Sequence, residues 1–88
     1  MDRLQVEKQF RDIALSLVAQ KMKVRLEHCG EGTFASQHEI LGIITEEYHE
    51  LVQAVQNNDK DELIEELLDV AVGAVFGIAS IIAETTDW

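Results

Sequence analysis

Apolar residues recur every three or four positions along most of this chain, which is the periodicity of amphipathic α-helices. Three segments carry the pattern, at about residues 2–28, 36–56 and 59–84. The chain contains no proline, and it has no alternating run of β-branched residues long enough for a strand. Short connections make neighbouring helices antiparallel. The pattern therefore predicts an all-α protein, an antiparallel helical bundle of three long helices per chain in one domain, 1–88.

Capping residues mark the ends of these segments. Ser36 is followed three positions later by Glu39, and Asp59 is followed in the same way by Glu62. Both pairs match the capping box, in which the first side chain accepts a hydrogen bond from the backbone N–H of the fourth residue. Gly30 is placed to terminate the first helix.

The apolar stripes indicate how the helices are buried. The first helix carries a stripe of Val6, Phe10, Ile13, Leu17 and Val24, and the second one of Ile40, Ile44, Leu51, Ala54 and Val55. The third helix is apolar almost all round, and two partner helices in one chain of 88 residues cannot cover it. We therefore expect a homodimer or homotetramer, with Val72 and Phe76 on the face that meets the second copy.

Acidic residues interrupt the apolar stripe of the second helix. At roughly 100° per residue, Glu47 falls in the middle of that stripe and Glu50 on its edge, whereas His49 points to the opposite face. Burying a carboxylate without a partner costs several kcal/mol or more. We therefore expect Glu47 to be paired, protonated or bound to a metal.

The third helix has one polar strip, and its first half is acidic. Glu62, Glu66 and Asp69 occupy that half, and Gly73, Gly77 and Ser80 occupy the other. We interpret the two glycines as a close contact between helices, and the three small residues together as space for a nucleotide near the subunit boundary.

A hairpin about Asn58 brings the two sets of acids together. Glu47 and Asp69 are equally distant from the turn, as are Glu50 and Glu66, so the four carboxylates are expected in two layers about 4.5 Å apart. Such a cluster repels itself unless a cation is present. An all-oxygen set of ligands favours Mg²⁺, with Mn²⁺ as a substitute.

Charge and cysteine content narrow the class of protein. A net charge of −10, from 17 acidic and 7 basic residues, argues against a nucleic-acid partner. One cysteine, Cys29, and a start without an apolar signal segment indicate a cytoplasmic protein. Asp69 interrupts the apolar run from Leu67 to Ala83, so we predict no membrane span.

These residues resemble a known family. The stretch with Glu46, Glu47 and Glu50, followed fifteen residues later by that with Glu66 and Asp69, is similar to the E-E-x-x-E and E-x-x-D pattern of the MazG-like nucleoside triphosphate pyrophosphohydrolases. Dimeric dUTPases are relatives of this all-α family. The resemblance covers about residues 21–83.

The resemblance implies a function and a set of site residues. It implies Mg²⁺-dependent cleavage between the α and β phosphates of a nucleoside triphosphate, giving a monophosphate and pyrophosphate, as in the house-cleaning of (d)NTPs. It implies Glu47, Glu50, Glu66 and Asp69 as metal ligands. Glu46, with Glu47, is then expected to orient or deprotonate water. Larger members carry a fourth helix, which a partner subunit would supply here.

Groups for the rest of the nucleotide lie nearer the start of the chain. Lys21 and Arg25 are spaced by four residues, and Lys21 is expected level with Glu46 and Glu47, so we predict phosphate contacts. The alternative for Lys21 is a structural ion pair with an acid. Phe34 and His38 are candidates for binding the base; the alternatives are a hydrophobic plug and a surface histidine.

Two other functions fit parts of the pattern. Glu46-x-x-His49 matches the E-x-x-H fragment of ferritin-like di-iron bundles, although His49 is expected to point away from Glu47. A catalytically silent helical dimerisation or partner-binding module is the plainer alternative. Turnover of nucleotides in Mg²⁺ separates these classes.

Overall fold

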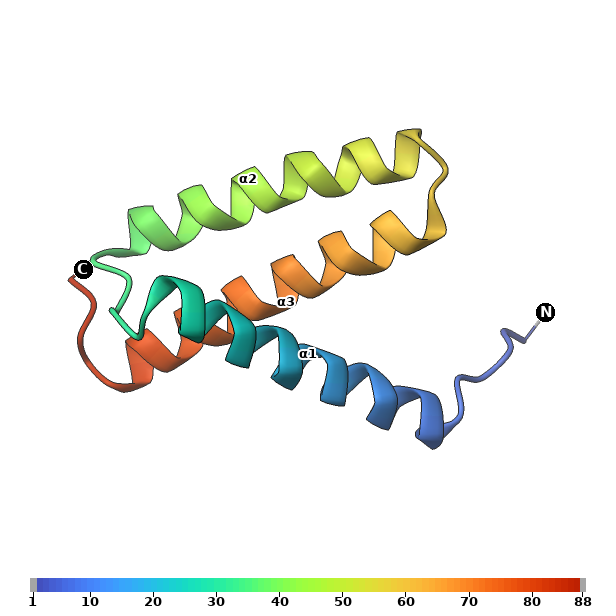
Figure 1. Cartoon of the computed structure of the whole chain (residues 1–88), viewed down its shortest axis with the longest axis horizontal. Helices are drawn as coiled ribbons and strands as arrows, with labels where there is room; N and C mark the ends of the chain where they lie inside the picture. Colours follow the sequence, from blue (N-terminus) through green and yellow to red (C-terminus); the bar gives the residue numbers. More distant parts are fainter. Residues whose placement is uncertain (1, 88) are drawn as a thin grey trace.

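The computed structural model of the protein describes residues 2–87 and contains three helices (Figure 1). They are α1 (Lys8–Cys29), α2 (Gln37–Gln56) and α3 (Lys60–Ile82). The described residues form no strand, apart from one isolated bridge between Ser36 and Asp87. The predicted all-α class is confirmed. Among the described residues, no helix has the length and apolar character needed to cross a membrane.

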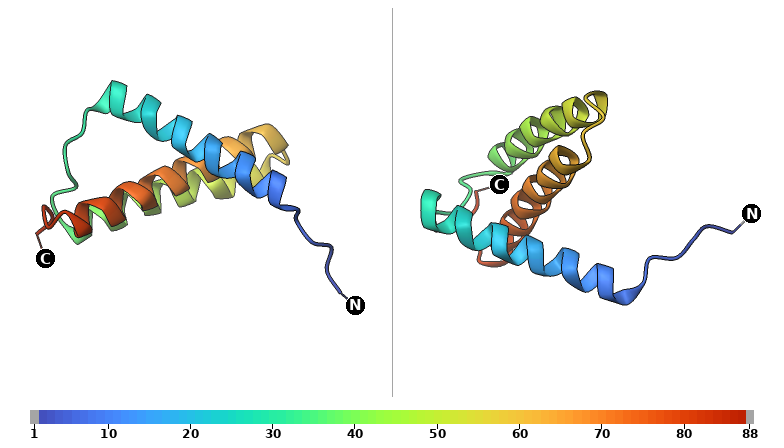
Figure 2. Two further views of the ribbon diagram at one scale, coloured as in Figure 1. Left: turned by 90° about the horizontal axis from the view of Figure 1, so that it is seen from below. Right: turned by 45° about the vertical axis from the view of Figure 1, so that its right-hand side comes forward.

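The helices pack as a hairpin with a third helix laid across it. α2 and α3 run antiparallel side by side, and α1 crosses α3 (Figures 1 and 2). α1 packs against α3 and, within residues 2–87, not against α2. α1 meets α3 near the middle of α1, where Lys21 contacts α3, and the N-terminal end of α1 points away from the hairpin (Figure 2). The α2–α3 hairpin is thus the packed unit of the chain.

Both predicted N-caps are present. Ser36 Oγ accepts a hydrogen bond from the N–H of Glu39 at 3.2 Å, and Glu39 Oε1 accepts one from the N–H of Ala35 at 3.0 Å. Asp59 Oδ1 accepts hydrogen bonds from the N–H groups of Asp61 and Glu62, each at 3.1 Å. Asn58, just before the second cap, has a φ of 52°, a left-handed conformation that asparagine tolerates well. These local contacts fix where α2 and α3 begin.

The outer helix ends differ from the predicted ones. α1 begins at Lys8 rather than near Asp2, because the preceding apolar residues, such as the 99 % exposed Leu4, gain no packing that would offset the entropy lost on ordering them. α3 ends at Ile82 rather than near Glu84, whose φ of 58° turns the chain. The turn ties the C-terminal segment to the α1–α2 loop, since the Asp87 N–H donates to the Ala35 carbonyl at 2.8 Å.

Close contact between α2 and α3 depends on two glycines. A Cβ at Gly73 would lie 3.2 Å from Ile44 Cδ1, and a Cβ at Gly77 would lie 3.2 Å from Ile40 Cγ2. Both glycines are buried, so the predicted close helix contact is confirmed. The expectation that they leave space for a nucleotide is wrong, because isoleucines of α2 fill that space. Ser80 is also buried, and its hydroxyl donates to the Phe76 carbonyl at 2.9 Å.

The core of the single chain is small. Its buried apolar side chains are Phe34, Ala54 and Val72, and no residue of α1 is buried. The apolar stripe predicted for the first helix is therefore exposed, including Phe10 at 55 % and Ile13 at 56 %. Val55 of the second predicted stripe is also exposed. These stripes find no cover because three helices arranged as a hairpin and a crossing helix leave one side of each open.

Candidate metal centre and adjoining cavity

Four carboxylates meet where α2 lies against α3. Glu47 and Glu50 come from α2, and Glu66 and Asp69 come from α3. One oxygen of each side chain lies within 4.8 Å of one oxygen of every other. All four residues are half-buried. The structure thus brings together the four acids that were predicted to converge, because the Asn58 turn sets the register of the hairpin.

The cluster resists full ionisation. The pKa of Glu47 is raised to about 7, chiefly by burial and then by the nearby negative charges of Asp69 and Glu50. The pKa of Glu66 is raised as well, first by burial and second by its hydrogen bond with Glu50. Within residues 2–87, Glu47 Oε2 and Glu66 Oε2 are buried without a hydrogen-bond partner. Two buried oxygens that lack a donor make this a site suited to a cation.

Lys21 lies at the edge of the cluster on the side of α1. Its Nζ is 2.8 Å from Glu65 Oε2 and 3.4 Å from Asp69 Oδ1. The hydrogen bond with Glu65 is the main reason why the pKa of Lys21 is raised. The structural ion pair that was the alternative for Lys21 is present, but its partners are Glu65 and Asp69 of α3 rather than acids of α2. Glu65, one residue before Glu66, is turned by about 100° from it toward α1 and stays exposed.

Glu46 and His49 lie outside the cluster. Both are exposed, and neither belongs to the group of four acids. The ring of His49 lies beside that of Tyr48, with the centroids 6.2 Å apart. The predicted outward direction of His49 is confirmed, which counts against a ferritin-like di-metal site.

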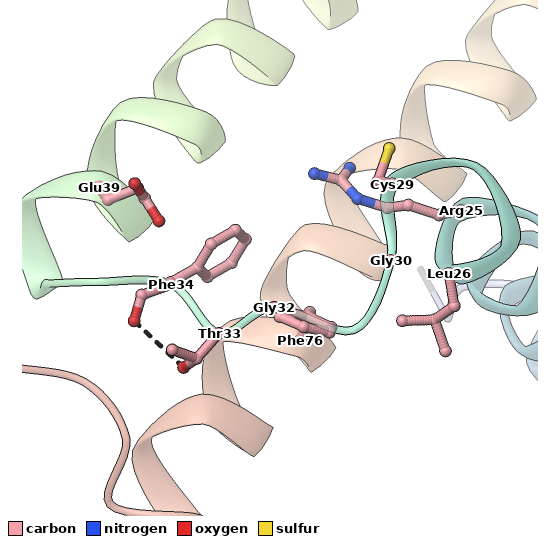
Figure 3. Close-up of a pocket in the computed structure, with 9 residues that line it drawn as sticks. All are labelled: Arg25, Leu26, Cys29, Gly30, Gly32, Thr33, Phe34, Glu39 and Phe76. Atoms are coloured by element: carbon pink, nitrogen blue, oxygen red, sulfur yellow. Dashed lines mark hydrogen bonds between the residues drawn. The ribbon is translucent and has the colours of Figure 1, made fainter.

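A cavity of about 180 Å³ opens between the end of α1 and the start of α2 (Figure 3). Arg25, Phe34, Glu39 and Phe76 are among its lining residues. Phe34 is buried and meets Phe76 edge to face, with ring centroids 5.2 Å apart. Phe34 thus serves as the hydrophobic plug that was its alternative role, and it also presents its ring to the cavity. His38 is exposed and does not line this cavity.

Sequence reasoning missed two residues of the cavity. Glu39 was assigned only to the cap of α2, and Phe76 only to the subunit interface. The structure directs both toward the α1–α2 loop. The signal for Phe76 was its spacing of seven residues from Asp69, which places both on one face of α3.

Comparison with protein families identifies this arrangement. A family model described as the MazG nucleotide pyrophosphohydrolase domain matches residues 35–88. The chain belongs to this family. The match contains α2, α3 and all four acids of the cluster, whereas α1, with Lys21 and Arg25, precedes it. Comparison with curated proteins and with solved structures finds no match. The predicted family resemblance is confirmed, and with it membership in a family of nucleotide-hydrolysing enzymes.

Proposed function

We propose that this single-domain MazG-family chain is an Mg²⁺-dependent nucleoside triphosphate pyrophosphohydrolase. It cleaves the bond between the α and β phosphates and releases a monophosphate and pyrophosphate, in the house-cleaning of (d)NTPs in the cytoplasm. The observation that carries this proposal is the four-carboxylate cluster, in which each side chain offers an oxygen within 4.8 Å of the others.

The residues of the cluster fit a hard divalent cation. The donors are all carboxylate oxygens, which Mg²⁺ and Mn²⁺ prefer. The two buried oxygens of Glu47 and Glu66 have no other partner within residues 2–87. We assign Glu47, Glu50, Glu66 and Asp69 as ligands. A cation bound there neutralises phosphate charge and lowers the pKa of a water molecule.

The chain's own groups then orient the substrate and accept a proton. Phosphoryl transfer depends on positioning and charge stabilisation more than on covalent help from the protein. We assign Glu46 or Glu47 to orient the attacking water and to take its proton.

We assign Lys21 to the phosphates as well. Its Nζ already bridges Glu65 and Asp69 at the edge of the cluster. If Asp69 held a cation, the ammonium group of Lys21 would be available to donate to a phosphate oxygen. Glu65 holds the lysine near the site in both situations.

Turnover tests this proposal directly. Purified protein is incubated with each common dNTP and NTP, with Mg²⁺ or with chelator, and pyrophosphate and monophosphate are measured. We expect both products in Mg²⁺ only. Glu50→Gln should lose turnover, whereas Glu27→Gln, a change to an exposed acid of α1, should retain it. Orthophosphate as the product, or equal turnover in the Glu50→Gln protein, would contradict the proposal.

We further propose that the working form is a homodimer or homotetramer. One face of α3, opposite the acids, is apolar and exposed in the single chain; it comprises Ile64, Leu67, Val75, Ile78 and Ile82. Soluble monomers rarely leave a contiguous apolar face of this kind uncovered. A second copy of the same helix covers it symmetrically. The same surface would serve a catalytically silent dimerisation module, which remains the alternative if no nucleotide is hydrolysed.

The residues of this interface differ from the predicted pair. Val72 is 1 % exposed in the single chain and Phe76 packs on Phe34, so both belong to the core of one chain. A charge at either would disrupt folding rather than assembly. Val75→Asp and Ile78→Asp test the interface instead. Sedimentation should show a dimer or larger species for the native chain and a monomer for these variants; a native monomer would rule out the assembly.

A further inference from the structure

The cavity at the end of α1 is lined by a cationic side chain, Arg25, that has no ion-pair partner among the described residues. Arg25 is half-buried and lines this cavity, and within residues 2–87 it takes part in no ion pair and no side-chain hydrogen bond. Glu39 lines the same cavity, and only its Oε1 is engaged, by the Ala35 N–H. In the view of Figure 3, the ring of Phe34 lies between the guanidinium of Arg25 and the carboxylate of Glu39.

The chemistry of this lining suits a flat, polar ring better than a phosphate. The rings of Phe34 and Phe76 provide aromatic surface, and an aromatic base stacks or packs on such rings favourably. The carboxylate of Glu39 would repel a phosphate. A volume of about 180 Å³ is below the 300–1,000 Å³ typical of sites for whole ligands, so the cavity accommodates one part of a larger molecule.

The cavity lies at a suitable distance from the acids. Phe76 follows Asp69 by seven residues on one face of α3, about 10 Å along the helix axis. Glu39 precedes Glu47 by eight residues on α2, about 12 Å along that axis. On α1, Arg25 follows Lys21 by one turn, so that Lys21 reaches the cluster and Arg25 the cavity. A nucleotide with its phosphates at the cluster would extend its base in this direction.

We propose that this cavity is the nucleobase subsite and that Arg25 reads the base, rather than a phosphate as its spacing from Lys21 first suggested. The inference rests on the proposed nucleotide pyrophosphohydrolase function. The planar fork of an arginine donates two parallel hydrogen bonds, so it selects a base with two adjacent acceptors. Guanine has such a pair in N7 and O6, and cytosine has one in N3 and O2.

The other bases lack this pattern. Adenine places its amino group beside N7 and N1, and uracil or thymine places an N–H between its two carbonyls. Guanine and cytosine also carry N–H donors that the free oxygen of Glu39 can accept. The chain should therefore prefer guanine and cytosine nucleotides over those of adenine and of uracil or thymine.

Binding of nucleoside monophosphates tests the subsite without requiring hydrolysis. We would titrate the full chain with GMP, CMP, AMP and UMP in Mg²⁺ and follow calorimetric heat or backbone amide shifts. GMP, CMP or both should bind about tenfold or more tightly than AMP and UMP, as expected for one bidentate arginine contact. The GMP and CMP arms decide which base the subsite takes.

Conservative variants separate base reading from phosphate binding. Arg25→Lys keeps the charge and removes the fork, so it should abolish the preference among bases. Arg11→Lys, the same change on an exposed part of α1, should leave it intact. Glu39→Gln retains an oxygen for the Ala35 N–H and should weaken the preferred monophosphate several-fold without lowering the melting temperature.

The outcomes distinguish this inference from the proposed reaction. Equal affinity for all four monophosphates, or a uniform loss with Arg25→Lys, overturns the base-reading role. Pyrophosphate release without any base preference leaves the reaction standing and removes the subsite. An Arg25-dependent preference without pyrophosphate release retains the subsite and removes the proposed reaction.

Discussion

The α2–α3 hairpin and the crossing helix α1 are stabilised in different ways. The hairpin has capped ends, two glycines in close helix contact and all four acids of the cluster. α1 has no side-chain cap, no buried residue and an exposed apolar stripe. It meets the hairpin through the ion pairs of Lys21 and through side chains of its C-terminal half. The family match covers the hairpin and begins after α1.

The hairpin and α1 therefore have different roles in the proposed site. The hairpin supplies every proposed metal ligand by itself, because its register is fixed by one turn and two caps. α1 contributes Lys21 and Arg25, which we propose to contact the substrate. We therefore expect changes in the hairpin to affect metal binding and stability strongly, and changes in α1 to affect stability weakly.

The largest effect is expected at the centre of the hairpin. Glu47→Gln removes a proposed metal ligand and a buried negative charge together, so turnover should fall by well over about a hundredfold, beyond the loss typical of changes that only support a ligand. The same substitution should stabilise the metal-free protein, because it relieves repulsion within the cluster. Kinetics and chemical denaturation measure the two effects. A less stable metal-free variant would contradict this account of the cluster.

The pH dependence of the metal-free protein provides a control for that variant. Because the pKa of Glu47 is higher in the folded state, about 7, than in the unfolded state, near 4.5, the folded form binds the extra proton between these values. The free energy of unfolding should therefore fall as pH rises from about 4.5 to about 7. Glu47→Gln should make this fall shallower.

Mg²⁺ should stabilise the native chain by mass action. At a concentration one hundred times its dissociation constant, a ligand that binds only the folded state adds about 2.7 kcal/mol to the free energy of unfolding. For a domain of this size, that corresponds to a rise in melting temperature of roughly 10 °C or more. Thermal melts with Mg²⁺ and with chelator measure it. An unchanged midpoint at saturating Mg²⁺ would exclude a native metal site.

The contact between the hairpin helices should tolerate an added methyl group less well than their outer surface does. Gly73→Ala places a Cβ 3.2 Å from Ile44 Cδ1, and overpacking of this kind costs about 1–3 kcal/mol. Gly42→Ala is the matched control, since a Cβ there meets nothing within 4 Å and alanine is the better helix former by up to about 1 kcal/mol. Chemical denaturation should show opposite signs. Equal effects would mean that the hairpin is not closely packed at Gly73.

Residues with local or periodic signals were the ones that sequence reasoning placed well. Ser36 and Asp59 fix helix starts through hydrogen bonds to their own neighbours, and helical spacing alone brings Glu47 to the side of Asp69. The position of α1 could not be derived in this way. It depends on which face of α3 stays free after the hairpin forms, so the partner Glu65 of Lys21 was not identified and Val72 was placed at the wrong surface.

The smallest effect is expected at the ion pairs that link α1 to the hairpin. Lys21→Gln should lower the free energy of unfolding by no more than about 1 kcal/mol, because partly exposed pairs contribute little. Lys8→Gln is the matched control, since it removes an exposed pair with Asp12 far from the cluster along α1.

The Lys21→Gln and Lys8→Gln variants should differ in their affinity for Mg²⁺. Lys21 places a positive charge 3.4 Å from Asp69, so its removal should tighten Mg²⁺ binding by up to about tenfold, whereas Lys8→Gln should not. Calorimetric titration of the metal measures this difference. If both variants bind Mg²⁺ like the native chain, α1 is electrostatically independent of the hairpin, and Lys21 has no place at its site.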